Sequence, residues 1–389
     1  MVLCFRLQTH LRLLYRERTK FLCERERQSG RNGRGGDVWF LNSVEESLGF
    51  VLADHDFDVW VGNVRGTHWS HGHISLSEKD KEFWDWSWQE LACYDLVEMI
   101  NYVHSVTDSK VFYVGHSQGT IMGLAAFTQP DIVDMVEAAA LLSPISYLDH
   151  INSPFVLKLV SMHLDKIILD MGFHQLNFRS DFGVRILDSM CDGHMDCNDL
   201  LSSITGKNCC FNNSRVDFYL EYEPHPSSSK NLNHLFQSKL IKLSRILFVW
   251  RKRLSLELEG DNSGELEGDN SGTHGEAVVV RTVIRKGNFA KYDYGLLGNF
   301  KRYGQTKPST FNLGNIPTSL PIWMAYGGND ALSDVTDLEH TIKELKHKPE
   351  LLYLESYAHI DFILSVRAKE DVYNQMIGFF QSQGKLSSS

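Results

Sequence analysis

The pentapeptide Gly115-His116-Ser117-Gln118-Gly119 is the most informative part of this chain for its fold. An apolar run rich in β-forming residues, Lys110–Val114, precedes it, and an apolar run able to form a buried helix, Thr120–Phe127, follows it. A strand, a sharp turn with serine at its apex and a helix together form a nucleophile elbow. Glycines are needed on both sides of the serine because the turn leaves no room for side chains between strand and helix.

The pentapeptide alone is a weak signal. Since glycine and serine each make up about 7% of residues, such a motif arises by chance in roughly one chain in ten of this length. The alternative is a glycine-rich turn with an exposed serine. The flanking strand and helix favour the elbow, and the presence of an acid and a base further along the chain would strengthen it.

Both partners occur in the order serine, acid, histidine. The acid candidate, Asp330, ends the segment Leu320–Asp330, in which an apolar strand runs into a Gly-Gly turn. The base candidate, His359, follows a second strand at Leu351–Glu355. The intervening residues hold one helix, about 334–346, and one strand, as a right-handed crossover requires. Loops after strand ends are where open α/β sheets place their chemistry.

The chemistry assigns a role to each residue. A serine hydroxyl is a poor nucleophile at its own pKa, so His359 must accept the proton of Ser117. Asp330 would fix the imidazole tautomer and stabilise the imidazolium. Two other acids compete with it. Asp334 is expected to cap the following helix, and Asp361 is too close in sequence to His359 to reach its ring, so we expect it to support the site indirectly.

The strand–helix rhythm predicts an α/β fold with a mostly parallel sheet and an inserted helical cap, or lid. We expect the core at residues 37–145 and 316–384, with the cap at 146–315 between its two parts. Within the cap, residues 241–282 are expected to be a flexible segment, because they contain an octapeptide repeated without change. Residues 1–36 are expected to be a basic, disordered leader.

The composition of the chain limits which functions and partners are possible. The chain has 389 residues, of which 42% are hydrophobic, so it can bury a large core. A net charge of −10 argues against nucleic acid as a partner. No apolar run approaches the length of a membrane span. The opening residues are broken by charges and resemble no signal peptide, so the sequence leaves the localisation open.

Four of the seven cysteines fall within a short segment: Cys191, Cys197, Cys209 and Cys210. Their spacing does not match a zinc site, and no other metal site is predicted. One or two local disulfides are expected, and the sequence cannot choose the pairing. Asn212-Asn-Ser214 is an N-glycosylation sequon, which predicts a glycoprotein.

Several blocks, in order, resemble the acid lipase family of α/β-hydrolases, which includes plant triacylglycerol lipases and the gastric and lysosomal acid lipases of animals. The matching blocks are DHDFDVWVGNVRGT (54–67), FWDWSWQE (83–90), YVGHSQGT (113–120), ALLSP (140–144), TGKNCC (205–210), NFAKYDYG (288–295), YGGNDALSD (326–334) and HIDF (359–362). The resemblance covers about residues 36–380 apart from one insertion.

The resemblance implies the α/β-hydrolase fold and a catalytic triad of Ser117, Asp330 and His359. It implies hydrolysis of triacylglycerol or sterol ester through an acyl-enzyme at a lipid–water interface, without a cofactor. It also implies a place in the secretory pathway, the vacuole or lysosome, or outside the cell.

One departure from the family concerns the oxyanion hole. The backbone N–H of Gln118 supplies one donor, but the family's apolar strand and His-Gly-Leu turn, which supply the other, are replaced by Arg25–Arg34. The first core strands are therefore expected to be missing. Loss of one donor costs about 10²–10³ in kcat.

Three interpretations follow. The leading one is a serine ester hydrolase that cleaves neutral lipid esters. The second is a catalytically impaired or silent hydrolase-fold protein that only binds lipid, because it lacks the oxyanion strand. The third keeps the triad but changes the substrate or the acceptor, giving a short-ester esterase or an acyltransferase.

Overall fold

A computed structural model gives the structure of the chain, and it describes residues 2–7, 37–177, 180, 200–237 and 289–386. Its centre is a six-stranded sheet in the order β2-β1-β3-β4-β7-β8. The strands are β1 (Val2–Leu7), β2 (Phe57–Gly62), β3 (Val111–His116), β4 (Val136–Leu142), β7 (Ile322–Gly327) and β8 (Glu350–Leu354). From β3 to β8 every pair is parallel, whereas β1 runs antiparallel to both of its neighbours.

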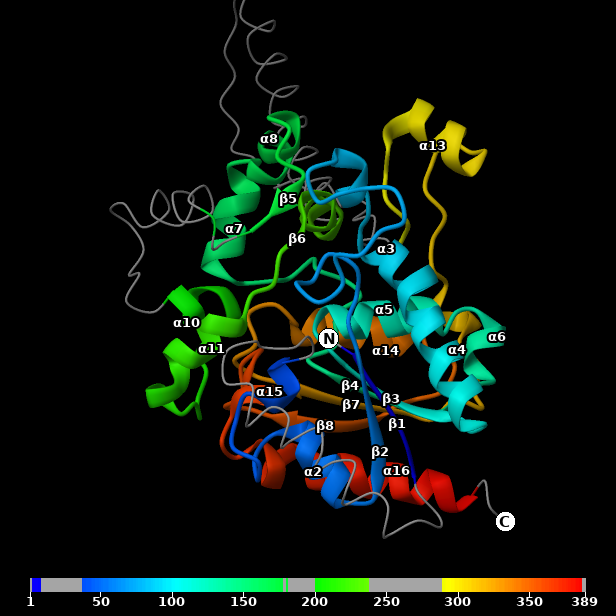
Figure 1. Cartoon of the computed structure of the whole chain (residues 1–389), viewed down its shortest axis with the longest axis vertical. Coiled ribbons are helices and arrows are strands. Elements are labelled where there is room, and N and C mark those ends of the chain that lie inside the picture. The colour runs from blue at the N-terminus through cyan, green and yellow to red at the C-terminus, as the bar shows by residue number, and fades with distance from the viewer. Residues whose placement is uncertain (1, 8–36, 178–179, 181–199, 238–288, 387–389) are drawn as a thin grey trace, which may run out of the picture.

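The sheet is buried on both faces, as expected of parallel strands joined by helices. All six residues of β3 are buried, and they alternate between two hydrophobic clusters: Val111 and Tyr113 belong to one, Phe112 and Val114 to the other. Helices cover each face (Figure 1). One face carries α3 (Trp88–Glu90), the π-helix η3 (Leu91–Asp95), α4 (Leu96–Thr107), α5 (Gln118–Ala126), α6 (Pro130–Val133) and α14 (Val335–Glu344). The other face carries α2 (Leu48–Asp54), α15 (Asp361–Leu364), the π-helix η7 (Lys369–Tyr373) and α16 (Asn374–Leu386).

Most of the cap lies beyond the sheet, in the upper half of Figure 1. It consists of short helices and a two-stranded ribbon. These elements are α7 (Pro154–Ser161), α8 (Leu164–Asp170), β5 (Gln175–Leu176), α10 (Leu200–Thr205), α11 (Val216–Tyr222), β6 (Ser227–Ser228) and α13 (Gly295–Tyr303). The remaining single turns are η1 (Asp37–Phe40), η2 (Lys81–Trp84), η5 (Asn213–Arg215) and η6 (Leu313–Asn315).

The predicted α/β-hydrolase core is confirmed, with one correction at its start. The expectation of a disordered leader is wrong for residues 2–7, whose backbone forms β1 between β2 and β3. The physical reason is that the facing edges of β2 and β3 carry N–H and C=O groups that need partners. Residues 8–36, which include Arg25–Arg34, lie outside the described residues, as do residues 241–282 with their predicted flexible repeat. The domain boundaries remain predictions.

Two of the four clustered cysteines lie in the described residues, and they are bonded to each other. A disulfide connects the adjacent residues Cys209 and Cys210. The other two cysteines of the cluster, Cys191 and Cys197, lie outside the described residues. Among the helices that the structure describes, none has the length and hydropathy of a membrane-spanning segment.

Candidate active site

Ser117 lies between the end of β3 and the start of α5. Its φ of 54° and ψ of −118° belong to a region that residues with a Cβ rarely adopt. Such strain persists only where the surroundings fix the backbone, and it is concentrated at functional sites. The conformation turns the chain sharply, so that the serine hydroxyl stands at the carboxyl edge of the sheet.

The glycines of the elbow are required by a close approach. A Cβ on Gly115 would lie 2.8 Å from the carbonyl carbon and oxygen of Gly119. The hydroxyl of Tyr113 donates a hydrogen bond to that same carbonyl, at 2.5 Å. A Cβ on Gly123, one turn into α5, would meet the ring of Tyr113 at 2.8 Å. Strand and helix are therefore packed backbone to backbone at the elbow.

The three predicted residues meet at this edge. The Ser117 hydroxyl is 2.7 Å from Nε2 of His359, and Nδ1 of His359 is 3.0 Å from both carboxylate oxygens of Asp330. Asp330 and His359 are only 4% and 3% exposed, so their interaction is shielded from water, while Ser117 is half-buried. The geometry allows the imidazole to accept the serine proton while the carboxylate fixes the opposite nitrogen as its donor.

The carboxylate of Asp330 is held by its own loop. Its Oδ1 accepts hydrogen bonds from the backbone N–H groups of Leu332 and Ser333, at 2.9 and 2.8 Å. The rival acid, Asp334, instead caps α14 and accepts a bond from the N–H of Thr336 at 2.7 Å. The structure therefore brings Asp330, and not Asp334, to the imidazole.

The main chain of His359 is also fixed. Its carbonyl accepts hydrogen bonds from Nε2 of His116, at 2.8 Å, and from the hydroxyl of Ser143, at 3.1 Å. Its N–H donates to the carbonyl of Thr205 in the cap, at 3.1 Å. Burial lowers the pKa of His116 well below its usual value, and the adjacent His359 adds to this effect, so His116 is a neutral donor.

Asp361 supports the site indirectly, as expected from its position close to His359 in the sequence. It is fully buried, and its carboxylate accepts N–H bonds from Ala358 (2.8 Å), Cys209 (3.0 Å) and Cys210 (3.4 Å). Burial raises the pKa of this carboxyl, while the three N–H donors oppose the rise. One buried carboxylate thus joins the loop of His359 to the cap.

The oxyanion donor predicted from the sequence is the backbone N–H of Gln118, the first residue of α5. The first N–H groups of a helix have no partner within the helix and point toward negative charge. The side chain of Gln118 accepts a 2.6 Å hydrogen bond from Nδ2 of Asn231, a cap residue that is 4% exposed. The segment in which the family has its second donor lies outside the described residues.

Sequence reasoning missed four residues that support the site: His116, Ser143, Thr205 and Asn231. His116, Ser143 and Thr205 stand in blocks that resemble the family, and His116 is part of the elbow motif itself. No local pattern shows that any of the four contacts His359 or Gln118. The tryptophans at 84, 86 and 88 are all at most 3% exposed and belong to one hydrophobic cluster, which fits packing rather than substrate contact.

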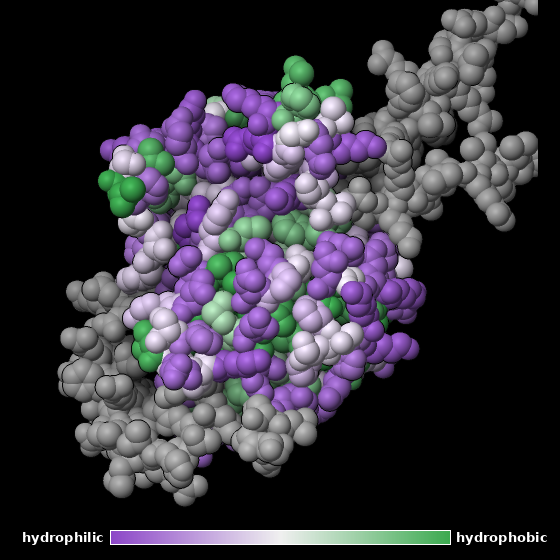
Figure 2. All heavy atoms as spheres, turned by 90° about the vertical axis from the view of Figure 1, so that its right-hand side faces the viewer, coloured by the Kyte–Doolittle hydropathy of each residue, from purple (hydrophilic) through white to green (hydrophobic). Residues whose placement is uncertain are grey.

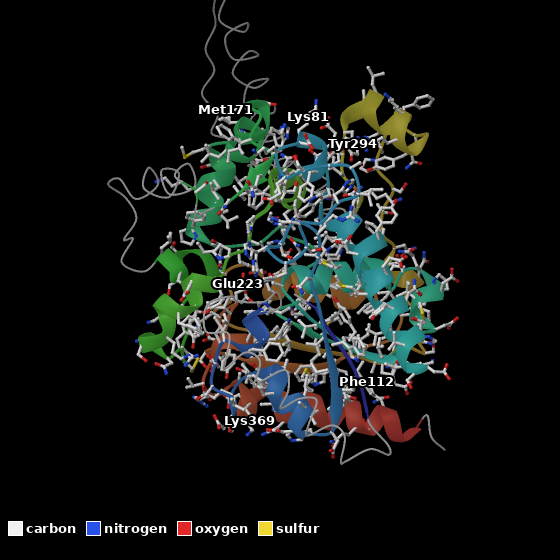
Figure 3. All side chains as sticks on the ribbon, in the orientation of Figure 1. Lys81, Phe112, Met171, Glu223, Tyr294 and Lys369 are labelled. Atoms are coloured by element: carbon white, nitrogen blue, oxygen red, sulfur yellow. A yellow bond between two sulfur atoms is a disulfide. The ribbon has the colours of Figure 1, made fainter. Side chains whose placement is uncertain are left out.

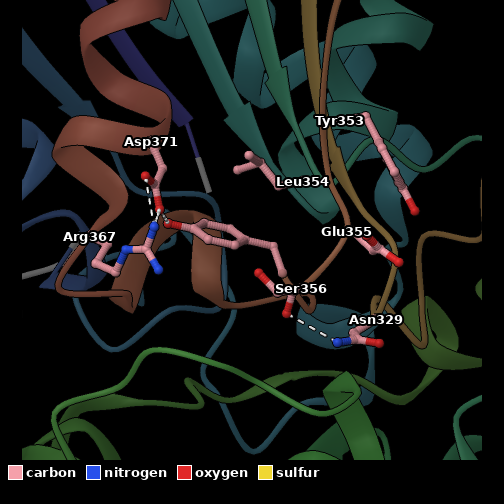
Figure 4. A pocket seen from close by; sticks show the side chains of 8 residues that line it. Asn329, Tyr353, Leu354, Glu355, Ser356, Arg367 and Asp371 are labelled. Carbon is pink, nitrogen blue, oxygen red and sulfur yellow. Dashed lines mark hydrogen bonds and ion pairs between the residues drawn. The ribbon is translucent and has the colours of Figure 1, made fainter.

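A separate pocket of about 520 Å³ is lined in part by residues close in sequence to Asp330 and His359, namely Asn329, Ser356 and Tyr357 (Figure 4). Its polar groups are already engaged with one another: Asn329 bonds the carbonyl of Ser356, and Asp371 pairs with Arg367 and with the hydroxyl of Tyr357. The lining residues are Asn329, Tyr353, Leu354, Glu355, Ser356, Tyr357, Arg367 and Asp371. None of the predicted catalytic residues lines it, so it is not the reaction site.

A serine at a strand–helix elbow, hydrogen-bonded to a histidine that is bonded in turn to an acid after a later strand, defines the α/β-hydrolase class. A family model described as alpha/beta hydrolase fold matches residues 32–172. The chain is 57% identical to triacylglycerol lipase 1 of Arabidopsis thaliana, over 91% of this chain and 78% of the relative. It is 30% identical to gastric triacylglycerol lipase of Bos taurus, over 89% and 77% of the two chains. It is also 30% identical to lysosomal acid lipase/cholesteryl ester hydrolase of Macaca fascicularis, over 88% and 76%.

This chain therefore belongs to the family of α/β-hydrolases that contains the plant triacylglycerol lipases and the gastric and lysosomal acid lipases. Members of this family are carboxylic ester hydrolases, and the chain is an enzyme of that class.

Proposed function

We propose that this chain hydrolyses neutral lipid esters through an acyl-enzyme formed on Ser117. The observation that carries the proposal is the continuous hydrogen-bond chain from the serine hydroxyl through His359 to Asp330, at 2.7 and 3.0 Å. The relatives are named for triacylglycerol and for cholesteryl ester. These two substrate classes share a fatty acyl ester and differ in the alcohol.

In the first half of the reaction, Ser117 Oγ attacks the ester carbonyl carbon while its proton passes to Nε2 of His359. Asp330 stabilises the imidazolium that forms. The tetrahedral intermediate then breaks its bond to the alcohol oxygen, which takes the proton from His359. The glyceride or sterol leaves as a neutral alcohol, and the acyl group remains on the serine.

In the second half, water replaces the alcohol. His359 accepts a proton from the water, whose oxygen attacks the acyl carbon. When the bond to Ser117 Oγ breaks, the proton returns to the serine and the fatty acid is released. In both halves the negative charge on the carbonyl oxygen is stabilised by the N–H of Gln118 at the start of α5.

The arrangement of the site does not favour the silent lipid-binding alternative. A protein with no need for catalysis has no reason to keep the strained backbone of Ser117 or to bury the charge of Asp330 against an imidazole. Further hydrogen bonds are made by the backbone of Ser117 and by the carboxylate of Asp330.

The direct test compares the chain with Ser117→Ala in the hydrolysis of p-nitrophenyl butyrate and tributyrin. We expect the variant to lose about 10⁴-fold or more in kcat, because the residual rate comes only from binding and the oxyanion hole. A burst of p-nitrophenol equal to the enzyme concentration would show the acyl-enzyme. A folded, monodisperse wild-type sample without activity would overturn the proposal in favour of a silent protein.

A second comparison separates the substrate classes. Rates on emulsified triolein and cholesteryl oleate are measured beside the rate on p-nitrophenyl butyrate. Activity on the soluble ester alone would indicate an esterase, and transfer of the acyl group to added glycerol in preference to water would indicate an acyltransferase.

A further inference from the structure

Helix α13 presents large hydrophobic side chains to solvent. Leu296, Leu297 and Phe300 are 69%, 88% and 63% exposed. They lie at positions i, i+1 and i+4 of a nine-residue helix, so they share one side of it. The helix stands at the end of the molecule away from the sheet (Figure 1), and hydrophobic residues protrude at that end of the face shown in Figure 2. A soluble protein has no reason to expose such side chains in a group unless they have a partner.

Two side chains of α13, those of Asn299 and Tyr303, anchor the helix to neighbouring segments. Asn299 is 1% exposed, donates to Oδ1 of Asp293 at 2.6 Å and accepts from the N–H of Tyr294 at 2.9 Å. The hydroxyl of Tyr303 donates to the carbonyl of Tyr292 at 3.0 Å. The exposed side chains are therefore held outward by a helix that cannot easily turn them inward.

Tyr294 also ties the helix to the body of the cap (Figure 3). Its hydroxyl lies 2.7 Å from Nζ of Lys230, a buried residue that pairs with Asp85 at 2.7 Å. The residue after this lysine is Asn231, which bonds the side chain of Gln118 beside the nucleophile. Residues that are neighbours in sequence thus connect the base of α13 with the elbow.

Exposed lysines accompany the hydrophobic group in the sequence: Lys301 lies in α13 and Lys307 in the loop that follows it. The helix itself contains no acidic residue, and the carboxylate of Asp293 before it is bonded by the N–H of Gly295 and by Asn299. Arg302 lies over the ring of Tyr294, at 4.2 Å from its centre, and pairs with Asp85. This arrangement contrasts with the net charge of −10 of the whole chain. Hydrophobic side chains accompanied by lysines fit a lipid surface that carries negative charge, since the lysine stems can lie along the lipid while their heads stay in water.

We propose that α13 is a docking element that inserts Leu296, Leu297 and Phe300 into an anionic lipid surface. The side chains of one short, projecting helix fall well short of the roughly 800 Å² per partner that a stable protein interface buries. A convex hydrophobic tip is instead suited to a deformable surface. The inference rests on the proposed function for its purpose, because a lipid hydrolase must reach substrate at an interface, but its test does not depend on catalysis.

The test is sedimentation of the full chain with unilamellar vesicles of phosphatidylcholine, pure or containing about 30% phosphatidylglycerol. We expect the wild type to bind the anionic vesicles, and Leu297→Gln with Phe300→Gln to lower its partition coefficient at least tenfold. The matched control is Val106→Gln with Leu351→Gln, which changes two exposed hydrophobic residues outside the cap and should bind as the wild type does. Lys301→Glu with Lys307→Glu should weaken binding to the anionic vesicles only, and salt should do the same.

Hydrolysis of p-nitrophenyl butyrate should be unchanged in all three double variants, which shows that they are folded. If the soluble ester is not cleaved even by the wild type, the proposed function fails while vesicle binding still tests α13. Equal binding by the wild type and the α13 variant, or no binding by either, would overturn the inference. It would also be overturned if the wild type formed a dimer in solution without lipid and the α13 variant were a monomer, because the helix would then dock on a second copy.

Discussion

At the scale of single residues, the site depends on backbone positions as much as on side chains. Ser117 holds a strained conformation where Gly115 allows β3 to meet the backbone of α5 at Gly119 without a side chain between them. The same approach places the N–H of Gln118 beside the serine. A change that separates strand from helix should therefore reduce stability and catalysis together.

Gly115→Ala tests this directly. The added methyl would lie 2.8 Å from backbone atoms of Gly119, which cannot move aside as a flexible side chain could. We expect a loss of about 2–3 kcal/mol in the free energy of unfolding, measured with urea, and at least a tenfold loss of kcat on p-nitrophenyl butyrate.

Gly378→Ala in α16 is the matched control, because a Cβ there meets no atom within 4 Å. In a helix this exchange should stabilise the protein by about 0.5–1 kcal/mol and leave kcat unchanged. Equal stability of the two variants would contradict the close approach seen at the elbow.

At the scale of elements, the cap and the core are joined through the catalytic loops themselves. The carbonyl of Thr205 accepts the N–H groups of Ala331 and His359, at 3.3 and 3.1 Å, and so contacts the loops of both the acid and the base. Asp361 bonds the adjacent peptides of Cys209 and Cys210. The cap is therefore part of the scaffold that positions the triad.

Asp361→Ala should show this coupling. The change leaves three N–H groups without an acceptor, two of them belonging to the cap. We expect the free energy of unfolding to fall by about 3 kcal/mol or more, and kcat to fall at least tenfold because the loop of His359 loses its anchor. Urea titration and steady-state kinetics on the soluble ester measure the two effects.

Asp334→Ala provides a comparison at a nearby carboxylate. This residue only caps α14, so its loss should cost about 1 kcal/mol and leave kcat within twofold. If Asp361→Ala reduced stability but left kcat intact, the link between cap and triad would be structural only.

At the scale of the whole molecule, burial of histidines makes stability depend on pH. Burial lowers the pKa of His234 to about 3, with a contribution from Lys230, although the carbonyl of Ala290 favours the proton. In the unfolded chain a histidine binds its proton at a pKa of about 6.5. Between these values the unfolded state binds more protons, so acidification favours unfolding, and stability present above pH ~6.5 is lost as the pH falls.

His234→Gln should therefore flatten the pH dependence. We expect the loss of unfolding free energy between pH 6.5 and 4.5 to be smaller by about 2–3 kcal/mol in the variant than in the wild type. The exposed His347→Gln is the control for the exchange of a histidine for glutamine. The raised pKa of Asp361 has the opposite effect on the pH dependence of stability. Because Asp361 is present in the wild type and in both variants, its effect cancels in the comparison. Parallel curves for the wild type and His234→Gln would show that the buried ring does not control acid stability.

The fold class and the residues that meet at the site could be predicted from the amino-acid sequence. The elbow around Ser117 is a local motif, and the chain order of Asp330 and His359 is fixed by how a parallel sheet is connected. Ser117, Asp330 and His359 each follow a strand that can be recognised in the sequence as a run of apolar residues. The role of Asp334 as a helix cap was equally local, since it depends on the few residues that follow.

The contacts that hold these loops could not be predicted from the sequence and are seen only in the folded chain. The bonds from His116, Ser143 and Thr205 to the backbone of His359 join residues more than 150 positions apart, and no pattern along the chain encodes them. The strand β1 could not be recognised from the sequence either, because residues 1–36 are basic overall. Nor does the sequence show which side of α13 is exposed. A side chain's burial, and a strand's place in a sheet, depend on what lies beside them after folding, and that is set by long-range packing rather than by local preference.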